Sequence, residues 1–480
     1  MADRPNILFA IADDASHFSA YGHTFVDTPH FDRVAADGIR FNNAFTTNPK
    51  CAPSRASILT GRHTWQNREA CQHWNFWPDG LAVFPDLLEA AGYHVGFTGK
   101  GWAPGDWQRC GRGRNPAGPH YNERRLEPPD GSKISGVDYA GNFADFLADR
   151  PQDAPFYFWY GGHEPHRHYT PGEGLAHGKR MEQVEQVPPY WPEEDVVRRD
   201  MLDYAFETEW FDAQLGKMLA LLEQRGELDN TLVVVTSDNG APFPRVKGNM
   251  YEDDFRLPCA VMWPQGIEGG RQVDDLVSFT DLAPTFLEAA EAASLDDCVG
   301  RSLFDIFAAS GSGMVTPDRQ RVYMGRERHD MGREDDLGYP VRCMRTSQYL
   351  YVRNFAPERW PAGNPETGYT GCDSSPTKAR ILTLKEEGQD ECWRLAFGKR
   401  PLEELYDIVA DSHCLENLAG RADMGPLKEK LWGELRAELE RSGDPRIEGR
   451  GDIFEQYDYV GEAQHSWAHY LKGDWQPQKY

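Results

Sequence analysis

Short apolar runs recur along this chain, and each of them ends abruptly in polar side chains. Four of these runs cover residues 6–12, 93–98, 156–160 and 232–236, and the polar residues that follow them are Asp13, Asp14, Lys100, His163, Asp238 and Asn239. Runs of this length without polar alternation are typical of buried parallel strands. Segments with helical periodicity, such as 196–225, separate the runs. This alternation predicts an α/β fold with a doubly wound sheet that is mixed but mostly parallel.

The polar residues at the ends of the runs are expected to meet in space. Parallel strands present their carboxyl ends at a common edge, and open α/β sheets bind ligands beyond that edge. Adjacent carboxylates such as Asp13 and Asp14 repel each other unless a cation lies between them, and Asp238 and Asn239 supply further oxygen ligands. The pattern indicates a site for a hard divalent cation, either Ca²⁺ or Mg²⁺.

The pattern of predicted elements changes after residues 308–313, a stretch that contains Gly and Ser. Short strand-like runs at 322–325, 341–346 and 349–354 are joined by turns, and residues 426–441 form an amphipathic helical pattern. A chain of 480 residues is too long for one modest core. We therefore predict a catalytic α/β domain over residues 1–315 and a smaller α+β domain over residues 316–480. The smaller domain is expected to hold an antiparallel sheet with one covering helix and to contribute to the active-site cleft.

Charge and composition exclude several classes of partner. A formal net charge of −25 opposes binding to nucleic acid and to anionic membrane surfaces. No segment reaches the roughly 20 apolar residues of a transmembrane helix, and no charged leader followed by a long hydrophobic stretch opens the sequence. We expect a soluble protein that neither binds nucleic acid nor inserts into membranes, cytoplasmic if the chain is full length and periplasmic or secreted if a signal was removed. The nine cysteines form no CxxC pair, which argues against a zinc site or a dense disulfide framework.

Residues 51–61 carry the most specific motif, Cys-Ala-Pro-Ser-Arg-Ala-Ser-Ile-Leu-Thr-Gly. This stretch resembles the signature of type I sulfatases, Cys-x-Pro-Ser-Arg followed by Leu-Thr-Gly. The resemblance covers nearly the whole chain and implies the alkaline-phosphatase-like fold. It also implies that a separate formylglycine-generating enzyme oxidises Cys51 to formylglycine, an aldehyde whose hydrate has two hydroxyls on one carbon. One hydroxyl would attack sulfur, and the other would later expel sulfate.

Some phosphonate and phosphodiester hydrolases share this motif, so it does not by itself choose sulfate over phosphate. A hydrolase of that kind with the same nucleophile is therefore one alternative. A catalytically silent saccharide-binding protein with the same fold is another. The complete Cys51 motif and the retention of every cation ligand argue against the silent protein.

The resemblance also assigns roles at the edge of the sheet. Asp13, Asp14, Asp238 and Asn239 match the residues that bind Ca²⁺ in sulfatases, with modified Cys51 as a further ligand, and Mg²⁺ remains the alternative ion. The bound cation would orient the nucleophilic hydroxyl and offset negative charge on the sulfuryl group.

Basic residues in the same motifs are expected to act on the sulfate. By resemblance, Arg55 would stabilise the formylglycine hydrate, and Lys100 and Lys247 would hold the sulfate oxygens. His166 matches the histidine that protonates the leaving group. One position departs from the family pattern, because Trp102 stands where sulfatases commonly have a second histidine. His163 and Asp238 are the candidates to take over its proton.

Four residues are predicted to contact the substrate beyond its sulfate, namely His163, Trp102, Arg326 and His329. The indole rings of Trp102, Trp74 and Trp107 are candidates to stack on sugar faces, although buried packing is the commoner role of tryptophan. The run of charged residues at 326–329 follows a predicted strand and is expected to extend from the smaller domain into the cleft.

Three stretches look most like N-sulfoglucosamine sulfohydrolases and their bacterial relatives. They are residues 164–167, 238–244 and 338–342. The resemblance implies an enzyme of glycosaminoglycan or polysaccharide degradation, with N-sulfated glucosamine as the leading substrate. An O-sulfatase acting on an algal sulfated polysaccharide remains the alternative.

Overall fold

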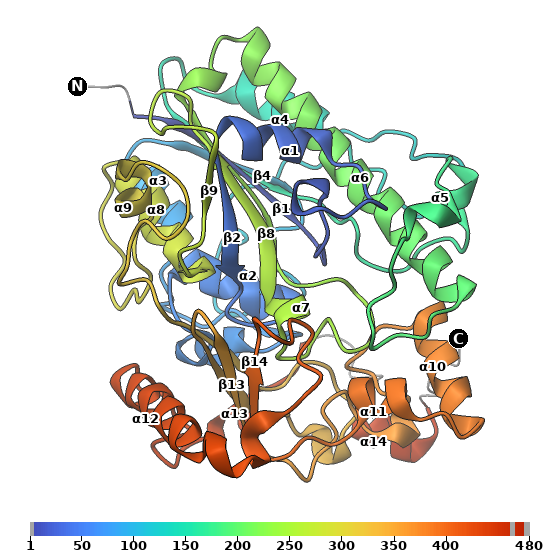
Figure 1. The fold of residues 1–480 in the computed structure, drawn as a ribbon. Coiled ribbons are helices and arrows are strands. Elements are labelled where there is room, and N and C mark those ends of the chain that lie inside the picture. The colour runs from blue at the N-terminus through green and yellow to red at the C-terminus, as the bar shows by residue number, and fades with distance from the viewer. Residues whose placement is uncertain (1–3, 461–465, 475–480) are drawn as a thin grey trace.

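A computed structural model describes residues 4–460 and 466–474, which form two main β-sheets flanked by helices (Figure 1). The strands of the larger sheet are β1 (Asn6–Ala12), β2 (Ile39–Phe45), β4 (His94–Gly99), β6 (Phe156–Gly161), β7 (Thr231–Ser237), β8 (Arg256–Met262), β9 (Arg271–Val273) and β10 (Val277–Ser278). Their order is β10-β2-β8-β7-β1-β6-β4, with β9 paired to β2. Strand β8 runs antiparallel to β2 and β7, whereas the other pairs are parallel. The predicted mixed, mostly parallel sheet is therefore confirmed.

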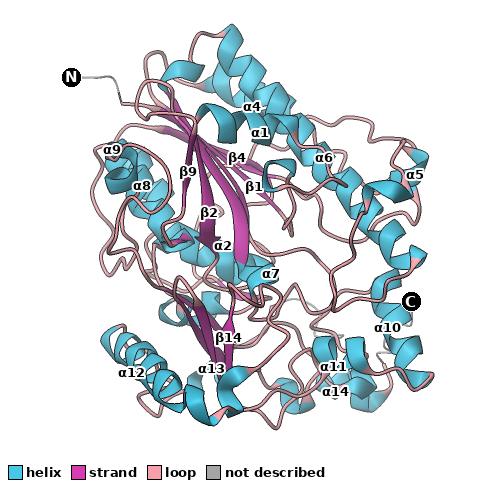
Figure 2. Cartoon of the chain, in the orientation of Figure 1, coloured by secondary structure: helices cyan, strands magenta, loops and turns pink. Residues whose placement is uncertain are grey.

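Helices cover both faces of this sheet (Figure 2). The elements on and around the sheet are α1 (Pro29–Asp37), α2 (Cys51–Thr60), α3 (Phe84–Ala90), α4 (Tyr139–Asp149), α5 (Glu173–Ala176), α6 (Asp195–Gln224), α7 (Glu252–Phe255), α8 (Leu282–Ala289) and α9 (Phe304–Ala308). Strands β3 (Asn75–Phe76) and β5 (Gly105–Asp106) form a separate two-stranded parallel sheet. The long helix expected at 196–225 is α6.

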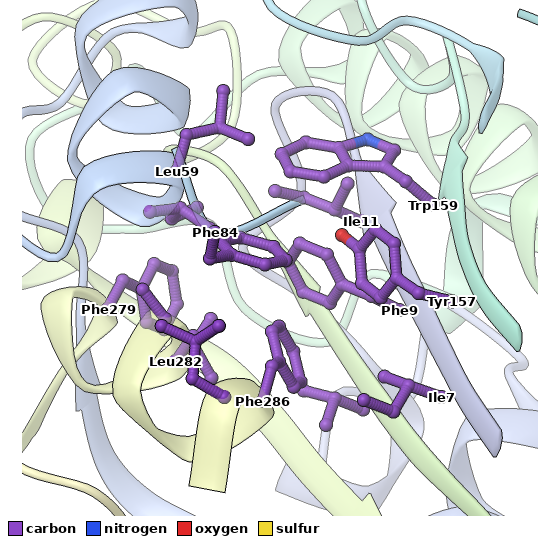
Figure 3. Close-up of a cluster of buried hydrophobic side chains, with 14 of the residues drawn as sticks. Ile7, Phe9, Ile11, Leu59, Phe84, Tyr157, Trp159, Phe279, Leu282 and Phe286 are labelled. Atoms are coloured by element: carbon purple, nitrogen blue, oxygen red, sulfur yellow. The ribbon is translucent and has the colours of Figure 1, made fainter. Parts of the chain in front are cut away.

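Strand β1 shows how the two cores are built. Successive side chains of a strand point to opposite faces of the sheet. Phe9 packs with Leu59 of α2, Phe84 of α3 and Phe286 of α8 in one buried cluster (Figure 3). The alternate residues Leu8, Ala10 and Ala12 lie in a second cluster with residues of α1, α4 and α6. Because both faces are covered, β1 is fully buried along its whole length.

The smaller sheet is antiparallel throughout. Its strands β11 (Val322–Arg326), β12 (Val341–Arg345), β13 (Tyr349–Asn354) and β14 (Glu403–Asp407) pair in that order. The helices in this part of the chain are α10 (Pro376–Glu386), α11 (Glu391–Phe397), α12 (Gly425–Arg441), α13 (Ile453–Gln456) and α14 (Trp467–Lys472). Leu431, Leu435 and Leu439 of α12 pack against this sheet, which confirms the predicted covering helix.

The two sheets share a buried cluster in which Phe45 and Phe255 pack with Met324. The N–H of Gly325 also donates to the carbonyl of Thr47 at 2.9 Å. The smaller sheet therefore lies directly beside the segment that leads into α2. The domain boundary at residue 315 stays a prediction. None of the helices within residues 4–460 and 466–474 has the length and hydropathy that a membrane-spanning segment requires.

Candidate active site

Strand ends of the larger sheet and the first turn of α2 converge on one point. Asp13 and Asp14 follow β1, Asp238 follows β7, and Lys100 follows β4. Cys51 is the first residue of α2. The sulfur of Cys51 and one carboxylate oxygen from each of the three aspartates lie within 4.8 Å of one another, and all four residues are buried. The convergence expected from the strand pattern is present.

The oxygen atoms around this point fit a hard divalent cation. Oδ1 of Asp13 and Oδ1 of Asn239 are buried without a hydrogen-bond partner. Asn239 turns its amide Nδ2 toward Oδ1 of Asp14 at 2.8 Å, which leaves its amide oxygen unpaired. Buried polar atoms are almost always satisfied by a partner, an ordered water or an ion. Carboxylate and amide oxygens are the ligands that Ca²⁺ and Mg²⁺ prefer.

The pKa values of two of these carboxyls are shifted in opposite directions. Burial opposes the ionisation of Asp13, but nearby cations, Lys100 foremost, outweigh burial and hold its pKa well below the usual range. Burial raises the pKa of Asp238 to about 7, although Arg55 opposes the rise. A metal cation beside both groups would favour the ionised form of each.

Three basic side chains are held in place by the same carboxylates. Arg55 is fully buried and donates from Nε to Oδ2 of Asp238 at 2.7 Å and from Nη1 to the carbonyl of Lys100 at 2.6 Å. Nζ of Lys100 lies 2.6 Å from Oδ2 of Asp13. Fixed cations of this kind stabilise negative charge that develops on a bound anion.

Lys247 completes the group from the loop after β7. Its Nζ lies 2.6 Å from Oδ2 of Asp14 and 2.9 Å from Oδ2 of Asp373. The Lys247 side chain is only 2% exposed, so its charge is directed inward.

The thiol of Cys51 is not activated by its surroundings. The residue has no exposed surface, and Sγ lies 3.8 Å from Oδ1 of Asp14. Burial, together with the charge of Asp13, raises the pKa of the thiol well above its usual value. Because the thiolate is the reactive form of cysteine, an unmodified Cys51 is a poor nucleophile in this site.

Two histidines from the loop after β6 face the cluster. Nδ1 of His166 lies 2.6 Å from the carbonyl of Arg167, and its Nε2 lies 3.9 Å from Oδ2 of Asp14. The ring is 38% exposed, so Nε2 is accessible from the cavity described below. Burial lowers the pKa of His163 to about 4, which keeps its ring neutral at physiological pH.

A cavity of about 810 Å³ opens over the cluster. The part of its wall that precedes the smaller sheet includes Asp13, Lys50, His73, Trp74, Lys100, Lys133, His163, His166 and Lys247. Residues from beyond position 315 complete the wall, namely Asp330, Thr370 and Asp373. Both parts of the chain therefore contribute to the cavity.

Three predicted substrate contacts, Trp102, Arg326 and His329, have buried side chains and are not among the residues that line this cavity. Trp102 has no exposed surface, and its Nε1 donates to the carbonyl of Ala52 at 3.0 Å. His329 is likewise fully buried, with Nε2 2.8 Å from Oδ1 of Asn48. Arg326 is 3% exposed and donates to the carbonyls of Gly248 and Pro361. These side chains support the walls of the site and do not reach its interior, whereas His163 does line the cavity.

Several residues of the wall are not predicted from the sequence. Lys50 stands directly before Cys51, and this adjacency was the one available signal. His73, Asp330 and Asp373 lie in loops without a motif, so only the folded structure brings them to the cavity.

Comparison with known proteins supports the resemblance drawn from the motifs. The family model described as Sulfatase matches residues 5–292, which is more than half of the chain. The model described as N-sulphoglucosamine sulphohydrolase, C-terminal, matches residues 246–355.

Relatives match over almost the full chain. An ulvan-active sulfatase of Formosa agariphila is 26% identical over 92% of this chain and 75% of its own length. The N-sulphoglucosamine sulphohydrolase of Homo sapiens is 27% identical over 94% of this chain and 93% of its own length.

Solved structures share the fold. A protein determined in complex with its substrate D-glucosamine-2-N,6-O-disulfate superposes with a TM-score of 0.66, at 21% identity, over 92% of this chain and 98% of that protein. The phosphonate monoester hydrolase of Agrobacterium radiobacter superposes with a TM-score of 0.62, at 18% identity, over 92% and 96% of the two chains. The predicted alkaline-phosphatase-like architecture is confirmed. On the strength of the matched family model and of relatives that hydrolyse sulfate esters and sulfamates, this chain belongs to the sulfatase family.

Proposed function

We propose that this sulfatase removes a sulfate group from a saccharide and that a formylglycine formed from Cys51 supplies the nucleophile. The observation that carries the proposal is the meeting of Cys51 with three carboxylates at one buried point, bordered by Arg55, Lys100 and Lys247. A formylglycine hydrate would supply a hydroxyl nucleophile where the raised pKa of the thiol disfavours the thiolate. Its formation requires a formylglycine-generating enzyme as a partner in maturation.

The basic residues are proposed to bind the sulfate group. Lys100 and Lys247 each pair with a carboxylate of the cluster, Lys100 with Asp13 and Lys247 with Asp14. Charges fixed in this way need no reorganisation when negative charge grows on the sulfate oxygens. Arg55 is proposed to steady position 51 and to keep Asp238 ionised.

His166 is proposed to donate a proton to the leaving oxygen or nitrogen from Nε2. Its Nδ1 is bound to the carbonyl of Arg167, so Nε2 is the atom that faces the cavity. Nε2 lies 3.9 Å from Oδ2 of Asp14, within the carboxylate cluster. The neutral ring of His163 lies in the same wall and is the candidate to receive the proton that sulfatases commonly pass to the histidine missing at position 102.

We propose Ca²⁺ as the ion held by Asp13, Asp14, Asp238 and Asn239, beside modified Cys51. When bound, it would act as a Lewis acid and offset charge on the sulfate. A buried set of protein oxygens suits Ca²⁺, because Mg²⁺ dehydrates reluctantly and usually keeps several waters.

N-sulfated glucosamine is the leading substrate. The human relative that carries this activity in its name aligns over 94% of the chain, and the matched C-terminal model has the same description. An O-sulfated algal polysaccharide is the second candidate, because two relatives from Formosa agariphila are ulvan-active sulfatases.

The test combines peptide mass spectrometry of position 51 with sulfate release from a saccharide panel. Protein made together with a formylglycine-generating enzyme is expected to carry the aldehyde and to release sulfate from N-sulfoglucosamine. Release only from O-sulfated ulvan fragments would keep the chemistry and change the substrate. Faster hydrolysis of an aryl phosphate ester than of the matching aryl sulfate would instead indicate a phosphonate or phosphodiester hydrolase with the same nucleophile.

Two variants serve as controls. Cys51→Ala is expected to abolish turnover, whereas Cys110→Ala, which removes a half-buried thiol outside the cavity, is expected to keep it. Wild-type turnover by Cys51→Ala would contradict the proposal.

A further inference from the structure

The cavity that must bind an anion also includes two carboxylates, Asp330 and Asp373, which are each more exposed than the lysine they pair with. Lys50 pairs with Asp330 at 2.7 Å, and the two side chains are 2% and 18% exposed. Lys247 pairs with Asp373 at 2.9 Å, and these side chains are 2% and 25% exposed. In both pairs the lysine is buried and the carboxylate faces the cavity. A wall built for a second sulfate would present the opposite arrangement.

Both carboxylates are fixed as hydrogen-bond acceptors. Oδ1 of Asp330 lies 2.8 Å from Nδ1 of His73, so the two oxygens of this carboxylate are each held by one group. Burial opposes the charge of Asp330, but Lys50 and His73 outweigh it and hold the pKa well below the usual range. Burial likewise opposes the charge of Asp373, and Lys247 and Lys50 lower its pKa. An ionised carboxylate oxygen can accept more than one hydrogen bond, so each group keeps capacity for a ligand donor.

An exposed indole stands beside these carboxylates. Trp74 is 44% exposed and lines the cavity next to His73, with the two ring centroids 5.9 Å apart. Its φ of 55° is in the left-handed region, which is unfavourable for an aromatic residue. Backbone hydrogen bonds from Val460 to the carbonyl of Trp74 and from His73 to the carbonyl of Arg328 hold this conformation. The fold thus holds a large apolar ring at the mouth of a polar cavity.

We propose that Trp74, Asp330 and Asp373 form a sugar subsite that binds a pyranose ring bearing hydroxyl or ammonium donors and rejects a second anionic group at the same place. A pyranose has an apolar C–H face that packs on an indole and equatorial hydroxyls that point sideways to neighbouring acceptors. A carboxylate or further sulfate on the ring would meet two fixed negative charges, and such repulsion gives specificity. This inference rests on the proposed saccharide substrate and names the groups that select it.

The experiment measures binding in the Cys51→Ala protein, so that affinity is read without turnover. The probes are inorganic sulfate and three sugars: N-sulfoglucosamine, glucosamine 6-sulfate and a sulfated ulvan oligosaccharide. The sugar that binds most tightly is then tested with Trp74→Ala, Trp74→Phe, Asp330→Asn and Asp373→Asn. Each of the Ala and Asn variants is expected to weaken sugar binding about tenfold, and Trp74→Phe is expected to restore most of the loss from Trp74→Ala.

Binding of inorganic sulfate distinguishes a loss of sugar recognition from a structural defect of the variant. Removal of a carboxylate cannot weaken an anion site by charge, so the affinity for sulfate is expected to be retained or increased in both Asn variants. A merely structural defect would lower the affinity for sulfate and sugar together. Trp432→Ala on α12 and Asp423→Asn, which lie outside the cavity, are matched controls that should change neither affinity.

The possible outcomes distinguish the proposed sugar subsite from the proposed sulfate hydrolysis. Unchanged sugar affinity in Trp74→Ala, Asp330→Asn and Asp373→Asn would overturn the subsite even if the mature enzyme hydrolyses that sugar. Sugar affinity that depends on Trp74 without any sulfate release by mature enzyme would support the subsite and overturn the proposed hydrolysis. If no sugar binds more tightly than inorganic sulfate, the subsite is wrong, and sulfate release by the mature enzyme alone decides the proposed hydrolysis.

Discussion

Arg55 links the structural and chemical parts of the site through one buried guanidinium. It binds Asp238, and it also holds the carbonyls of Lys100 and Gly101 at 2.6 and 3.1 Å. We predict that Arg55→Ala lowers the free energy of unfolding by about 3–5 kcal/mol, because it leaves a buried carboxylate without its partner. Denaturant unfolding in the presence of a chelator measures this loss. Arg33→Ala, which breaks an exposed ion pair, should cost less than about 1 kcal/mol, and an equal loss in both variants would contradict the argument.

His166 should matter most for poor leaving groups. We predict that His166→Asn lowers kcat on a sulfated sugar about 10²–10⁴-fold, since general acid catalysis typically contributes that much. The loss should be far smaller on an aryl sulfate, whose phenolate leaves without a proton. His177→Asn, a ring stacked on Phe206 outside the cavity, is the matched control and should leave both rates intact. An equal loss on both substrates would show that His166 does not act as the acid.

The position of a single residue can be predicted from the sequence when it belongs to a local motif. It cannot be predicted when tertiary packing alone determines it. Asp13 and Asp238 directly follow apolar runs, so their place at the sheet edge could be predicted. Trp102 sits next to a motif and was expected in the cleft, yet its indole packs at 5.1 Å from that of Trp77 in the core. Asp330 and Asp373 reach the cavity through loops whose course no local pattern determines.

Among the elements, α12 is fastened to the segment after α2 by a buried pair. His63 Nε2 lies 2.9 Å from Oε1 of Glu438, and Trp65 Nε1 donates to Oγ of Ser442 at 2.9 Å. Burial alone would raise the pKa of Glu438, but hydrogen bonds from His63 and Arg441 lower it to about 2. Burial also lowers the pKa of His63, so acid disfavours the folded form through both groups.

These pKa shifts determine the direction in which the stability of the folded protein changes with pH. A carboxyl with a depressed folded pKa stabilises the protein above about pH 4.5, and this stabilisation is lost as the pH falls toward 2. We predict that Glu438→Gln lowers stability by about 2 kcal/mol at pH 7 and by almost nothing near pH 2. Unfolding curves of both proteins across this range measure the difference. A difference in the free energy of unfolding that does not change with pH would contradict the stabilising role of the Glu438–His63 pair.

Most elements follow from hydrophobic patterning, and the exceptions have local causes. Strand β2 was not identified, because Asn42 and Asn43 interrupt it where its register with β8 shifts. Strand β8 contains Pro258, which lacks the N–H of a regular ladder and argues against a central strand. The carbonyl of Pro258 instead accepts from Oγ1 of Thr236 at 2.7 Å.

For the molecule as a whole, the carboxylate cluster ties stability to a metal ion. We predict that saturating Ca²⁺ raises the free energy of unfolding, by about 4 kcal/mol at a thousandfold excess over its Kd, because the ligand residues meet only in the folded state. Thermal unfolding with Ca²⁺, Mg²⁺ or a chelator measures the effect, and Ca²⁺ should exceed Mg²⁺. Asp14→Asn should reduce the difference between Ca²⁺ and chelator. The same midpoint in all three conditions would contradict a metal site.

The burial of Cys51 also has a consequence for the order of events during biosynthesis. Its sulfur has no exposed surface, and the groups that enclose it come from both earlier and later parts of the chain, Asp14 and Asp238 among them. An enzyme that oxidises this residue needs an accessible peptide, and the finished protein offers none. Under the proposed conversion to formylglycine, maturation would have to precede the folding step that brings Asp238, after β7, against residue 51. Protein that folds without the modification would remain in that state when the maturing enzyme arrives later.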